Sequence, residues 1–428
     1  MERYSEYKDC GIQWLGEIPS HWDAVRTKYV ARLYTGNSLN EREKEKYSSS
    51  VDDCYPYISS KDISLETESV NYNNGLSIPK GEKAFELAPS NSFLLCIEGG
   101  SAGRKKAFLT EDVCFVNKLC CFNSEINPKY HYYTLQSFYF GAKFRSSLQG
   151  MIGGVSVSTI KNFYLTVPSK EEQVKIVAYL DEIIGKIHTA IEQQQKMIDL
   201  LNERKQIIIN NAVTKGLNSG VPMKDSGVDW IGKIPEHWEM KRLKTILGVK
   251  DERNTDPDAI LLSVYTAIGV RPRQELEERG NKASTVINYK IVNKGDLIVN
   301  RLLAWMGAYG LSNYDGVTSP DYDVYSFHAD VNKDYFETLF RNTQFKSDCY
   351  KYGHGIMMMR WRTYSDEFLN IRVPIPPKGE QNAIFEYLRP QINKIEDRIT
   401  LCNKLISLLQ ERKQIIINDV VTGKVKVS

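Results

Sequence analysis

The sequence contains one octapeptide twice, as Glu203-Arg-Lys-Gln-Ile-Ile-Ile-Asn210 and again as Glu411-Arg-Lys-Gln-Ile-Ile-Ile-Asn418. The two copies are 208 positions apart (411 − 203 = 208). An identity of this length within one chain indicates an internal repeat. We therefore expect a chain built from two related halves.

The repeat extends on both sides of the octapeptide. At the same offset, Val167–Gln173 aligns with Ile375–Gln381, so the two copies run from there to the octapeptide without a gap. A second shared block, Lys8–Trp22, matches Lys224–Trp238 at an offset of 216 (224 − 8 = 216). The material between the shared blocks differs in length and sequence. The chain therefore alternates between variable segments and shared segments.

Length and composition are those of a water-soluble protein of several structural units. The chain has 428 residues, of which 42% are hydrophobic and 25% charged, and a chain of this length is expected to form two to four units. No apolar run approaches the roughly 20 residues that a membrane span requires. The N-terminal residues Met1–Glu6 lack an apolar signal region, so we expect a cytoplasmic protein.

The cysteines and the net charge exclude little but guide the choice of partner. Eight cysteines are scattered without a Cys-x-x-Cys pair, which favours reduced packing thiols over a disulfide framework or a zinc site. The net charge is only +3. Binding to a polyanion is therefore permitted, but it must depend on local clusters of Lys and Arg.

Two variable segments are expected to form mixed α+β modules. We define module 1 as residues 1–168 and module 2 as residues 216–376. Short apolar segments such as Phe93–Ile97 and Asp296–Asn300 alternate with Gly-rich turns, as in strands, while Tyr130–Phe144 is compatible with a helix.

Two long helices are expected to follow the modules, in helical regions 169–215 and 377–428. Ser169-x-x-Glu172 is a capping-box pattern that predicts the start of the first helix, and Gly216 predicts its end. The second helix is expected to run from near Gly379 to about Val421. Pro390 lies inside it and predicts a kink near its start.

Both helices carry a heptad seam of apolar residues. The spacing alternates between four and three residues for more than four heptads, with Gln194 as one polar interruption and a Lys at matching seam positions in both copies, Lys205 and Lys413. The seam residues are Leu180, Ile184, Ile187, Ile191, Ile198 and Leu201 in the first helix, and Leu388, Ile392, Ile395, Ile399, Ile406 and Leu409 in the second.

The two seams are expected to pack on each other. Each helix is about 60 Å long at ~1.5 Å per residue, and the connectivity requires them to run antiparallel. The predicted fold is therefore α+β, with two α+β modules separated by an antiparallel coiled coil and related by a pseudo-two-fold axis. The alternative is that each helix packs only on its own module.

The sequence lacks the motifs of a self-contained DNA-modifying enzyme. Ser319-Pro-Asp-Tyr322 approaches a methyltransferase motif but lacks its second Pro, so we interpret it as a turn. Gly99–Gly103 is Gly-rich but lacks the spacing of a phosphate-binding loop. No His, Asp or Glu cluster has metal-ligand spacing. His21 and His237 occupy matched repeat positions and are expected to be structural.

The arrangement resembles the specificity (S) subunit of type I DNA restriction-modification systems. The resemblance covers essentially the whole chain. Its marks are Trp230–Trp238 with its earlier copy, Ile375–Gln381 with Val167–Gln173, and the doubled octapeptide.

This resemblance implies a non-catalytic subunit that recognises double-stranded DNA. Each module would be a target recognition domain for one half of a bipartite, asymmetric site. The helices would set the spacing and dock two modification (methyltransferase) subunits, alongside restriction (translocase and endonuclease) subunits. The chain itself would bind no cofactor, because S-adenosylmethionine, Mg and ATP would belong to the partner subunits. A self-contained methyltransferase or nuclease and a protein-binding scaffold remain the alternatives.

A DNA-binding chain needs Lys and Arg for phosphates and polar side chains for base edges. Clusters of such residues lie next to Gly-containing loops, Gly150–Gly154 in module 1 and Gly353–Gly355 in module 2, which we expect to approach the duplex. The candidate DNA-binding residues are Arg104, Lys105, Lys106, Lys143 and Arg145 in module 1, and Arg301, Lys351, Arg360 and Arg362 in module 2. No catalytic or metal-binding residue is predicted.

Overall fold

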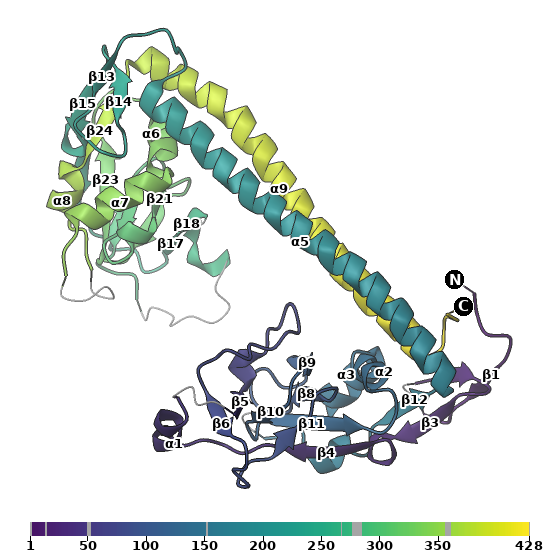
Figure 1. Cartoon of the computed structure of the whole chain (residues 1–428). Helices are drawn as coiled ribbons and strands as arrows, with labels where there is room; N and C mark the ends of the chain where they lie inside the picture. Colours follow the sequence, from purple (N-terminus) through teal and green to yellow (C-terminus); the bar gives the residue numbers. More distant parts are fainter. Residues whose placement is uncertain are drawn as a thin grey trace. The chain divides into compact units, whose positions relative to one another are not determined.

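The computed structural model describes residues 2–12, 15–48, 53–150, 153–266, 268–275, 285–355 and 361–427. The chain divides into two compact units. Unit 1 comprises Met1–Gln194 with Lys404–Ser428, and unit 2 comprises Gln195–Asn403. Each unit contains one module and a segment of each long helix (Figure 1).

The two long helices are present. Helix α5 spans Lys170–Lys215, 46 residues, and α9 spans Lys378–Val421, 44 residues. The Ser169 hydroxyl caps the first of them, accepting from the Glu172 N–H at 3.2 Å. Helix α9 continues through Pro390.

Each helix ends before a glycine in the left-handed region. Gly216 has φ 72° and Gly423 has φ 74°, a conformation that favours glycine and suits a helix C-terminus. A Cβ atom on Gly216 would lie 3.1 Å from the Trp238 ring, and one on Gly423 would clash with Pro19. Each helix end is therefore pressed against the Trp/Pro block of a module.

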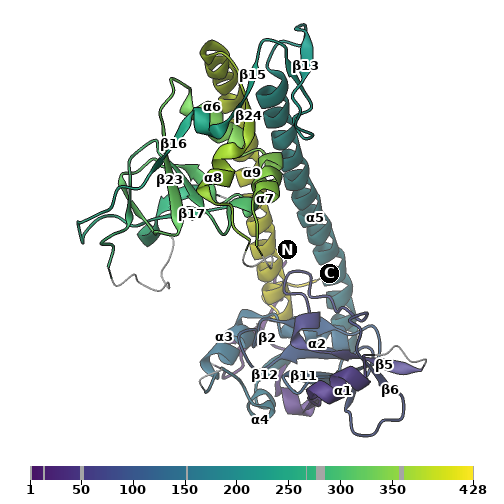
Figure 2. The same cartoon turned by 90° about the vertical axis from the view of Figure 1, so that its left-hand side faces the viewer.

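In each unit, a stretch of α5 lies antiparallel to a stretch of α9 (Figures 1 and 2). In unit 1, Lys413 Nζ lies 3.1 Å from His188 Nε2. In unit 2, Lys205 Nζ lies 3.1 Å from Glu396 Oε1. The residue numbers add to 601 in both pairs, so both units use the same antiparallel register. The predicted α+β fold with paired antiparallel helices is confirmed.

Module 1 is built on two four-stranded sheets, with strand orders β4-β11-β8-β9 and β6-β5-β10-β7, and two pairs, β1-β2 and β12-β3. Its strands are β1 Tyr7–Asp9, β2 Glu17–Pro19, β3 Asp23–Arg26, β4 Ala31–Thr35, β5 Cys54–Ile58, β6 Ser77–Pro79, β7 Leu87–Ala88, β8 Phe93–Cys96, β9 Lys106–Phe108, β10 Val113–Phe115, β11 Leu119–Ser124 and β12 Tyr164–Val167. Its α-helices are α1 Glu41–Lys46, α2 Pro128–Thr134, α3 Phe138–Ser146 and α4 Val157–Ile160.

Module 2 repeats the central sheet with the order β16-β23-β20-β21, accompanied by the pairs β13-β14, β15-β24, β17-β18 and β19-β22. Its strands are β13 Met223–Asp225, β14 Lys233–Pro235, β15 Glu239–Arg242, β16 Leu247–Lys250, β17 Leu262–Tyr265, β18 Gly269–Pro272, β19 Lys290–Val292, β20 Leu297–Asn300, β21 Tyr309–Leu311, β22 Gly316–Thr318, β23 Tyr322–Phe327 and β24 Arg372–Ile375. Its α-helices are α6 Lys333–Phe340, α7 Thr343–Tyr352 and α8 Ser365–Asn370.

The central strand of each module is buried on both faces, which explains its continuous apolar sequence. In β8, Phe93 and Leu95 enter the core shared with the long helices, whereas Leu94 and Cys96 enter a second core. In β20, Leu297 likewise faces the helix-side core. Each central strand therefore joins the helix pair to the outer part of its module.

The ends of the long helices belong to these cores. Ile417 and Val421 at the end of α9 pack into the core of module 1. Ile209 and Val213 at the end of α5 pack into the core of module 2. The octapeptide of α5 therefore ends in the core of module 2, and the octapeptide of α9 ends in the core of module 1. Both copies are buried in the same way, which explains why their sequences are the same.

Candidate nucleic-acid interface

A Trp-His pair fixes each module to the first turn of its helix. In module 1, His21 Nε2 lies 3.1 Å from Glu172 Oε1, and Trp22 Nε1 donates to the same carboxylate at 3.4 Å. In module 2, His237 and Trp238 make the matching contacts to Glu380, at 2.6 and 2.9 Å. Each histidine therefore contacts the first turn of a long helix, as expected for a structural residue. The Glu172 carboxylate points to the Trp/His block, in addition to its capping role through its N–H.

A glutamine one position further along makes a second attachment. Gln173 Oε1 accepts from the Asn127 N–H at 3.0 Å, and its amide donates to Pro168 O. Gln381 does the same with the Asn332 N–H, at 2.8 Å, and with Pro376 O. Both ends of each amide are used, so the start of α2 and of α6 is held at a fixed point beside a long helix.

A buried tyrosine makes the third attachment, to the end of the opposite helix. Tyr130 of α2 donates to Val421 O at 3.4 Å, and Tyr335 of α6 donates to Val213 O at 3.3 Å. The acceptors are 208 positions apart (421 − 213 = 208). Both modules are thus mounted on the helices by equivalent contacts, while their outer loops are free to differ.

Two loops and the end of one helix converge in module 1. The Gly-rich loop after β8 contacts the hairpin Gln149–Gly154, because the Gly99 N–H donates to Gly153 O at 2.9 Å. The same loop packs on the end of α3, where a Cβ on Gly103 would lie 2.5 Å from the Phe144 ring. Met151 and Ile152 of this hairpin lie outside the described residues.

The module 1 candidates differ in how accessible their charges are. Arg104, Lys143 and Arg145 are exposed, and the Gly103–Phe144 contact brings the Gly-rich loop to the last turn of α3, which carries the latter two. Lys105 instead donates to Ser60 O at 2.7 Å. Lys106 is largely buried and pairs with Glu68 at 3.1 Å, so a phosphate contact from it would require that ion pair to open.

Module 2 brings together the corresponding elements. The Thr363 N–H donates to Arg301 O at 3.0 Å, as the Val155 N–H donates to Ile97 O at 2.9 Å in module 1. His354 and Arg362 face each other in a hairpin that matches Gln149 and Gly154. Both modules therefore place a strand-end loop, the end of a helix and a Gly-containing hairpin at one site.

The module 2 candidates gather around this hairpin. Lys351 at the end of α7 and Arg362 in the hairpin are exposed, whereas the Arg301 side chain is about 28% exposed and pairs with Asp323. Trp361 stacks on Tyr350 with ring centroids 4.8 Å apart. Arg360 lies outside the described residues. The base or phosphate contacts of all these residues remain predictions.

The predicted seam residues lie on the inner faces of the helices to different degrees. Seven of the twelve are buried and five are half-buried. The buried ones are Leu180, Ile184, Ile187, Ile198, Leu201, Leu388 and Ile395, and the half-buried ones are Ile191, Ile392, Ile399, Ile406 and Leu409.

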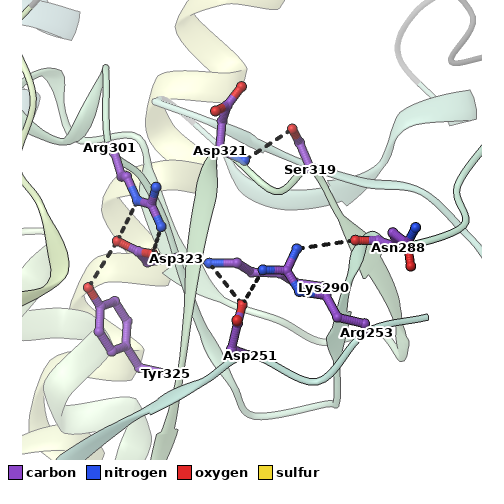
Figure 3. A network of polar contacts seen from close by, with 9 residues as sticks. All are labelled: Asp251, Arg253, Asn288, Lys290, Arg301, Ser319, Asp321, Asp323 and Tyr325. Carbon is purple, nitrogen blue, oxygen red and sulfur yellow. Dashed lines mark hydrogen bonds and ion pairs between the residues drawn. The ribbon is translucent and has the colours of Figure 1, made fainter.

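A network of buried charges in module 2 was not anticipated (Figure 3). Asp323 on β23 is 1% exposed and contacts Arg301 and Lys290, the latter itself 4% exposed. Burial alone would raise the pKa of Asp323, but hydrogen bonding to Arg301 and the two nearby cations hold it below its usual value. The available signal was an Asp inside an apolar strand, where Asp is depleted.

A second unanticipated network lies in unit 1. Glu68 accepts from Tyr132 at 2.7 Å and pairs with Lys106. The pKa of Lys413 is lowered by burial, with the Lys106 charge acting in the same direction and the Glu68 charge opposing it. The doubled Lys was visible in the sequence, but its module 1 partners were not.

The turn predicted at Ser319–Tyr322 is present, with the Tyr322 N–H donating to Ser319 O at 3.0 Å. Among the residues that the structure describes, no group of three His, Cys, Asp or Glu side chains could hold a metal ion. Within the same ranges, every helix is too short or too polar to span a bilayer.

Comparison with known proteins agrees with this architecture. Residues 19–197 match the family model of the type I restriction modification DNA specificity domain. The type I restriction enzyme MjaVIII specificity subunit of Methanocaldococcus jannaschii is 24% identical, over 96% of this chain and 94% of that protein. The putative type I restriction enzyme MjaX specificity subunit of the same organism is 25% identical, over 71% of this chain and 69% of that protein.

A solved structure shares the fold. A chain from a study of complex assembly and conformational transition of the type I R-M system aligns with a TM-score of 0.69 at 12% identity, covering 94% of this chain and 98% of that one. The two chains therefore share an arrangement of two α+β modules on paired helices. Residues 19–197 therefore match a type I restriction modification DNA specificity domain, and over nearly its whole length the chain is similar to a type I specificity subunit.

Proposed function

We propose that the chain is a non-catalytic DNA-recognition subunit of a type I restriction-modification complex, in which each module recognises one half of a bipartite, asymmetric site. The observation that carries the proposal is the matched mounting of two unlike modules. The attachments through Glu172 and Glu380, Gln173 and Gln381, and Tyr130 and Tyr335 are equivalent. Equivalent mounting with different loops suits two half-sites of different sequence.

The functional division follows the repeat. Residues 1–168 and 216–376 are the two target recognition domains, and residues 169–215 and 377–428 are the helical regions. DNA contacts come from the site where strand-end loop, helix end and hairpin converge in each module, with Arg104, Lys143 and Arg145 or Arg301, Lys351 and Arg362. Exposed Lys and Arg supply sequence-independent affinity, and the loops supply specificity.

The helices also offer a docking surface, present twice. We define the apolar stripes as Met197, Leu200 and Ile207 on α5, and Leu405, Leu408 and Ile415 on α9. Each member of one stripe lies 208 positions from a member of the other, and all six are between 40% and 60% exposed. Exposed apolar groups in a repeated pattern favour a partner that binds twice in the same way. Two modification subunits are that partner, and S-adenosylmethionine, Mg and ATP belong to the partner subunits.

Selection from a random double-stranded DNA library tests the recognition function. The complex of this chain with co-expressed modification subunits should enrich a split motif, two short half-sites separated by a fixed number of unspecified base pairs. Replacing module 1 by the corresponding module of a relative should change one half-site and leave the other. Enrichment of no sequence, or of one continuous site insensitive to the exchange, would reject the proposal.

The spacing function has its own test. Removal of seven residues from α5 and the equivalent seven from α9 shortens each helix by about 10 Å at ~1.5 Å per residue. If the helices set the spacing, the variant should select both original half-sites with a shorter spacer. An unchanged spacer would refute the role of the helices in measuring distance.

Docking is tested by charge insertion in the stripes. Leu200→Glu and Leu408→Glu each place a carboxylate at an exposed apolar position, so folding should be little affected. Each variant should bind one modification subunit fewer than wild type, and the double variant should bind none, as measured by native mass spectrometry. Leu217→Glu, another exposed leucine outside the stripes, is the matched control and should retain both subunits.

A further inference from the structure

The charge network of module 2 is centred on one carboxylate. Asp323 Oδ2 accepts from Arg301 Nε at 2.9 Å, and Asp323 Oδ1 accepts from Arg301 Nη2 and from Lys290 Nζ, the latter at 3.2 Å (Figure 3). Tyr325 also donates to this carboxylate, at 3.4 Å. The guanidinium is thus held side-on by two parallel hydrogen bonds, an arrangement that fixes its plane.

Module 1 shows what the fold itself requires at these positions. In both modules an Asp closes the turn between two equivalent strands. Asp112 accepts from the Ser90 N–H at 2.7 Å, and Asp315 accepts from the Lys294 N–H at 2.8 Å. The strand registers agree as well, since Leu95 pairs with Cys120 and Val299 pairs with Asp323.

This correspondence assigns an equivalent in module 1 to Asp323 and to Arg301. Asp323 matches Cys120, and Arg301 matches Ile97, whose carbonyl accepts the equivalent hairpin hydrogen bond. Cys120 is fully buried and Ile97 is 7% exposed. The same framework position is therefore apolar in module 1 and charged in module 2, so the fold does not need the ion pair.

Burying ions without a structural need is unfavourable. The desolvation of a buried ion pair commonly offsets its Coulombic gain, and well-packed apolar residues at the same place are often as stable or more so. Module 1 has that apolar solution. The retention of Asp323, Arg301 and Lys290 together in module 2 therefore calls for a role that the apolar pair cannot fill.

The guanidinium retains the donors that such a role requires. Arginine carries five N–H donors, and the contacts to Asp323 use Nε–H and one hydrogen of Nη2. Among the described residues, the hydrogen bonds of this guanidinium all go to Asp323. Two donors on its outer end, one each from Nη1 and Nη2, form the pair that matches O6 and N7 of guanine.

The position of Arg301 also suits contact with DNA. It directly follows β20, at the site where loop, helix end and hairpin converge, and its side chain is about 28% exposed. The Arg301 carbonyl accepts from the Thr363 N–H. Arg362, which directly precedes Thr363, is exposed and therefore lies close to Arg301. A partner reaching this site would meet the outer end of a guanidinium whose orientation is already fixed.

We propose that Arg301 is a specificity-determining residue of module 2 that recognises a guanine in its half-site, and that Asp323, with Lys290, is the positioning residue that orients it. The inference rests on the proposed DNA-recognition function and names the base. Preorganisation by Asp323 removes rotamer freedom from Arg301 before binding. Lys290 donates to Asp323 Oδ1 at 3.2 Å and helps to keep the carboxylate in place.

Library selection with the complex of this chain and its modification subunits tests the inference. Wild type should enrich a motif with a guanine in the half-site of module 2. Arg301→Lys keeps the charge but loses the planar pair of donors. It should reduce the preference for guanine at that single position on the order of 10- to 100-fold, with the module 1 half-site unchanged. Asp323→Asn should relax the same position, although Arg301 is intact.

Two further variants separate recognition from folding. The triple variant Arg301→Ile, Asp323→Cys, Lys290→Met copies the apolar pair of module 1 and also removes the ammonium group that would lose its carboxylate partner. It should fold, with a circular dichroism spectrum and melting temperature close to wild type, and still lose the guanine preference. Arg253→Gln changes an exposed member of the same network that pairs with Asp251 at 2.7 Å. It is the matched control and should leave the motif intact.

The outcomes distinguish the inference from the function it rests on. If wild type selects a split motif and the Arg301→Lys and Asp323→Asn complexes select the same motif with the same base preferences, the inference is overturned. It is also overturned if the relaxed position is not a guanine, or if both half-sites weaken equally, as for a phosphate contact. If wild type selects no split motif, the proposed function itself fails.

Discussion

Lys413 and Lys205 occupy equivalent positions of the repeat, yet their surroundings differ. Lys413 is 9% exposed and faces His188 at 3.1 Å, with Glu68 of module 1 as the nearby countercharge. Lys205 is less buried and pairs directly with Glu396, the residue that takes the place of His188 in the other copy. The same octapeptide therefore gives a buried cation in unit 1 and a partly exposed ion pair in unit 2.

The difference shows which part of each unit sets its electrostatics. The helical repeat supplies the same lysine twice, but the module decides whether that lysine is covered. Module 1 closes over its lysine with Glu68 and Lys106, whereas module 2 buries its charges within its own sheet, around Asp323. The contacts that both units share attach each module to the long helices. The variable parts of the modules determine where charged side chains are buried.

The largest expected effect comes from removing the carboxylate of the buried cluster. Glu68→Gln is nearly isosteric but leaves the ammonium groups of Lys106 and Lys413 without their anion. Because one partner of a buried ionic cluster is lost, the free energy of unfolding should fall by about 3 kcal/mol. Urea unfolding at pH 7, followed by tryptophan fluorescence and circular dichroism, measures the change.

The matched change in unit 2 is Glu396→Gln, which breaks the ion pair with Lys205. The Glu396 side chain is 54% exposed, so the loss should stay below about 1 kcal/mol. Equal losses in the two variants would show that the burial of the two lysines does not differ in energetic terms. The addition of Lys413→Met to Glu68→Gln should recover part of the stability.

The sequence was sufficient for the framework because the framework is local and repeated. The seam spacing, the Gly216 stop and the doubled octapeptide predict the two helices and their antiparallel pairing. The Trp/His block indicated a structural role for His21 and His237, which the contacts to Glu172 and Glu380 explain. These features depend on periodicity and on identical residues at fixed offsets.

The charge networks could not be predicted, because they join residues far apart in the chain. Glu68 meets Lys413 across more than 300 positions, and Arg301 meets Asp323 only through the register of β20 and β23. A list of basic residues cannot separate exposed Arg104 from Lys106, whose charge is paired with Glu68. Which candidates contact DNA remains a prediction for the same reason.

The next effect concerns pH and a second matched pair, His131 and Phe336. Equivalent contacts to Gln173 and Gln381 place the two at the same point of α2 and α6. His131 is fully buried against Phe93 and Phe122, and burial lowers its pKa from 6.5 to about 3. The unfolded chain therefore binds a proton below pH 6.5 that the folded chain does not, so stability falls as the pH falls.

His131→Phe copies unit 2 and removes this proton uptake. At pH 5 the variant should be more stable than wild type by about 2 kcal/mol relative to their difference at pH 8. Urea unfolding across pH 5–8 measures the slope. His188, whose pKa burial and Lys413 also lower, contributes in the same direction and is present in both proteins. Phe336→His should create the slope in unit 2. Parallel pH profiles for wild type and His131→Phe would contradict the assignment.

The smallest effect is expected at the midpoint of the seam, where the copies carry Gln194 and Cys402. Both side chains are half-buried, but only the glutamine has a polar amide that loses water when the seams pack. Gln194→Leu should therefore stabilise the protein by roughly 1 kcal/mol, seen as a higher melting temperature in differential scanning calorimetry. Cys402→Leu is the matched control and should change stability less, because a thiol already behaves as a small apolar group. A lower melting temperature for Gln194→Leu would mean that the amide serves the helix pairing, and that the polar interruption in one copy is a further way in which the two halves differ.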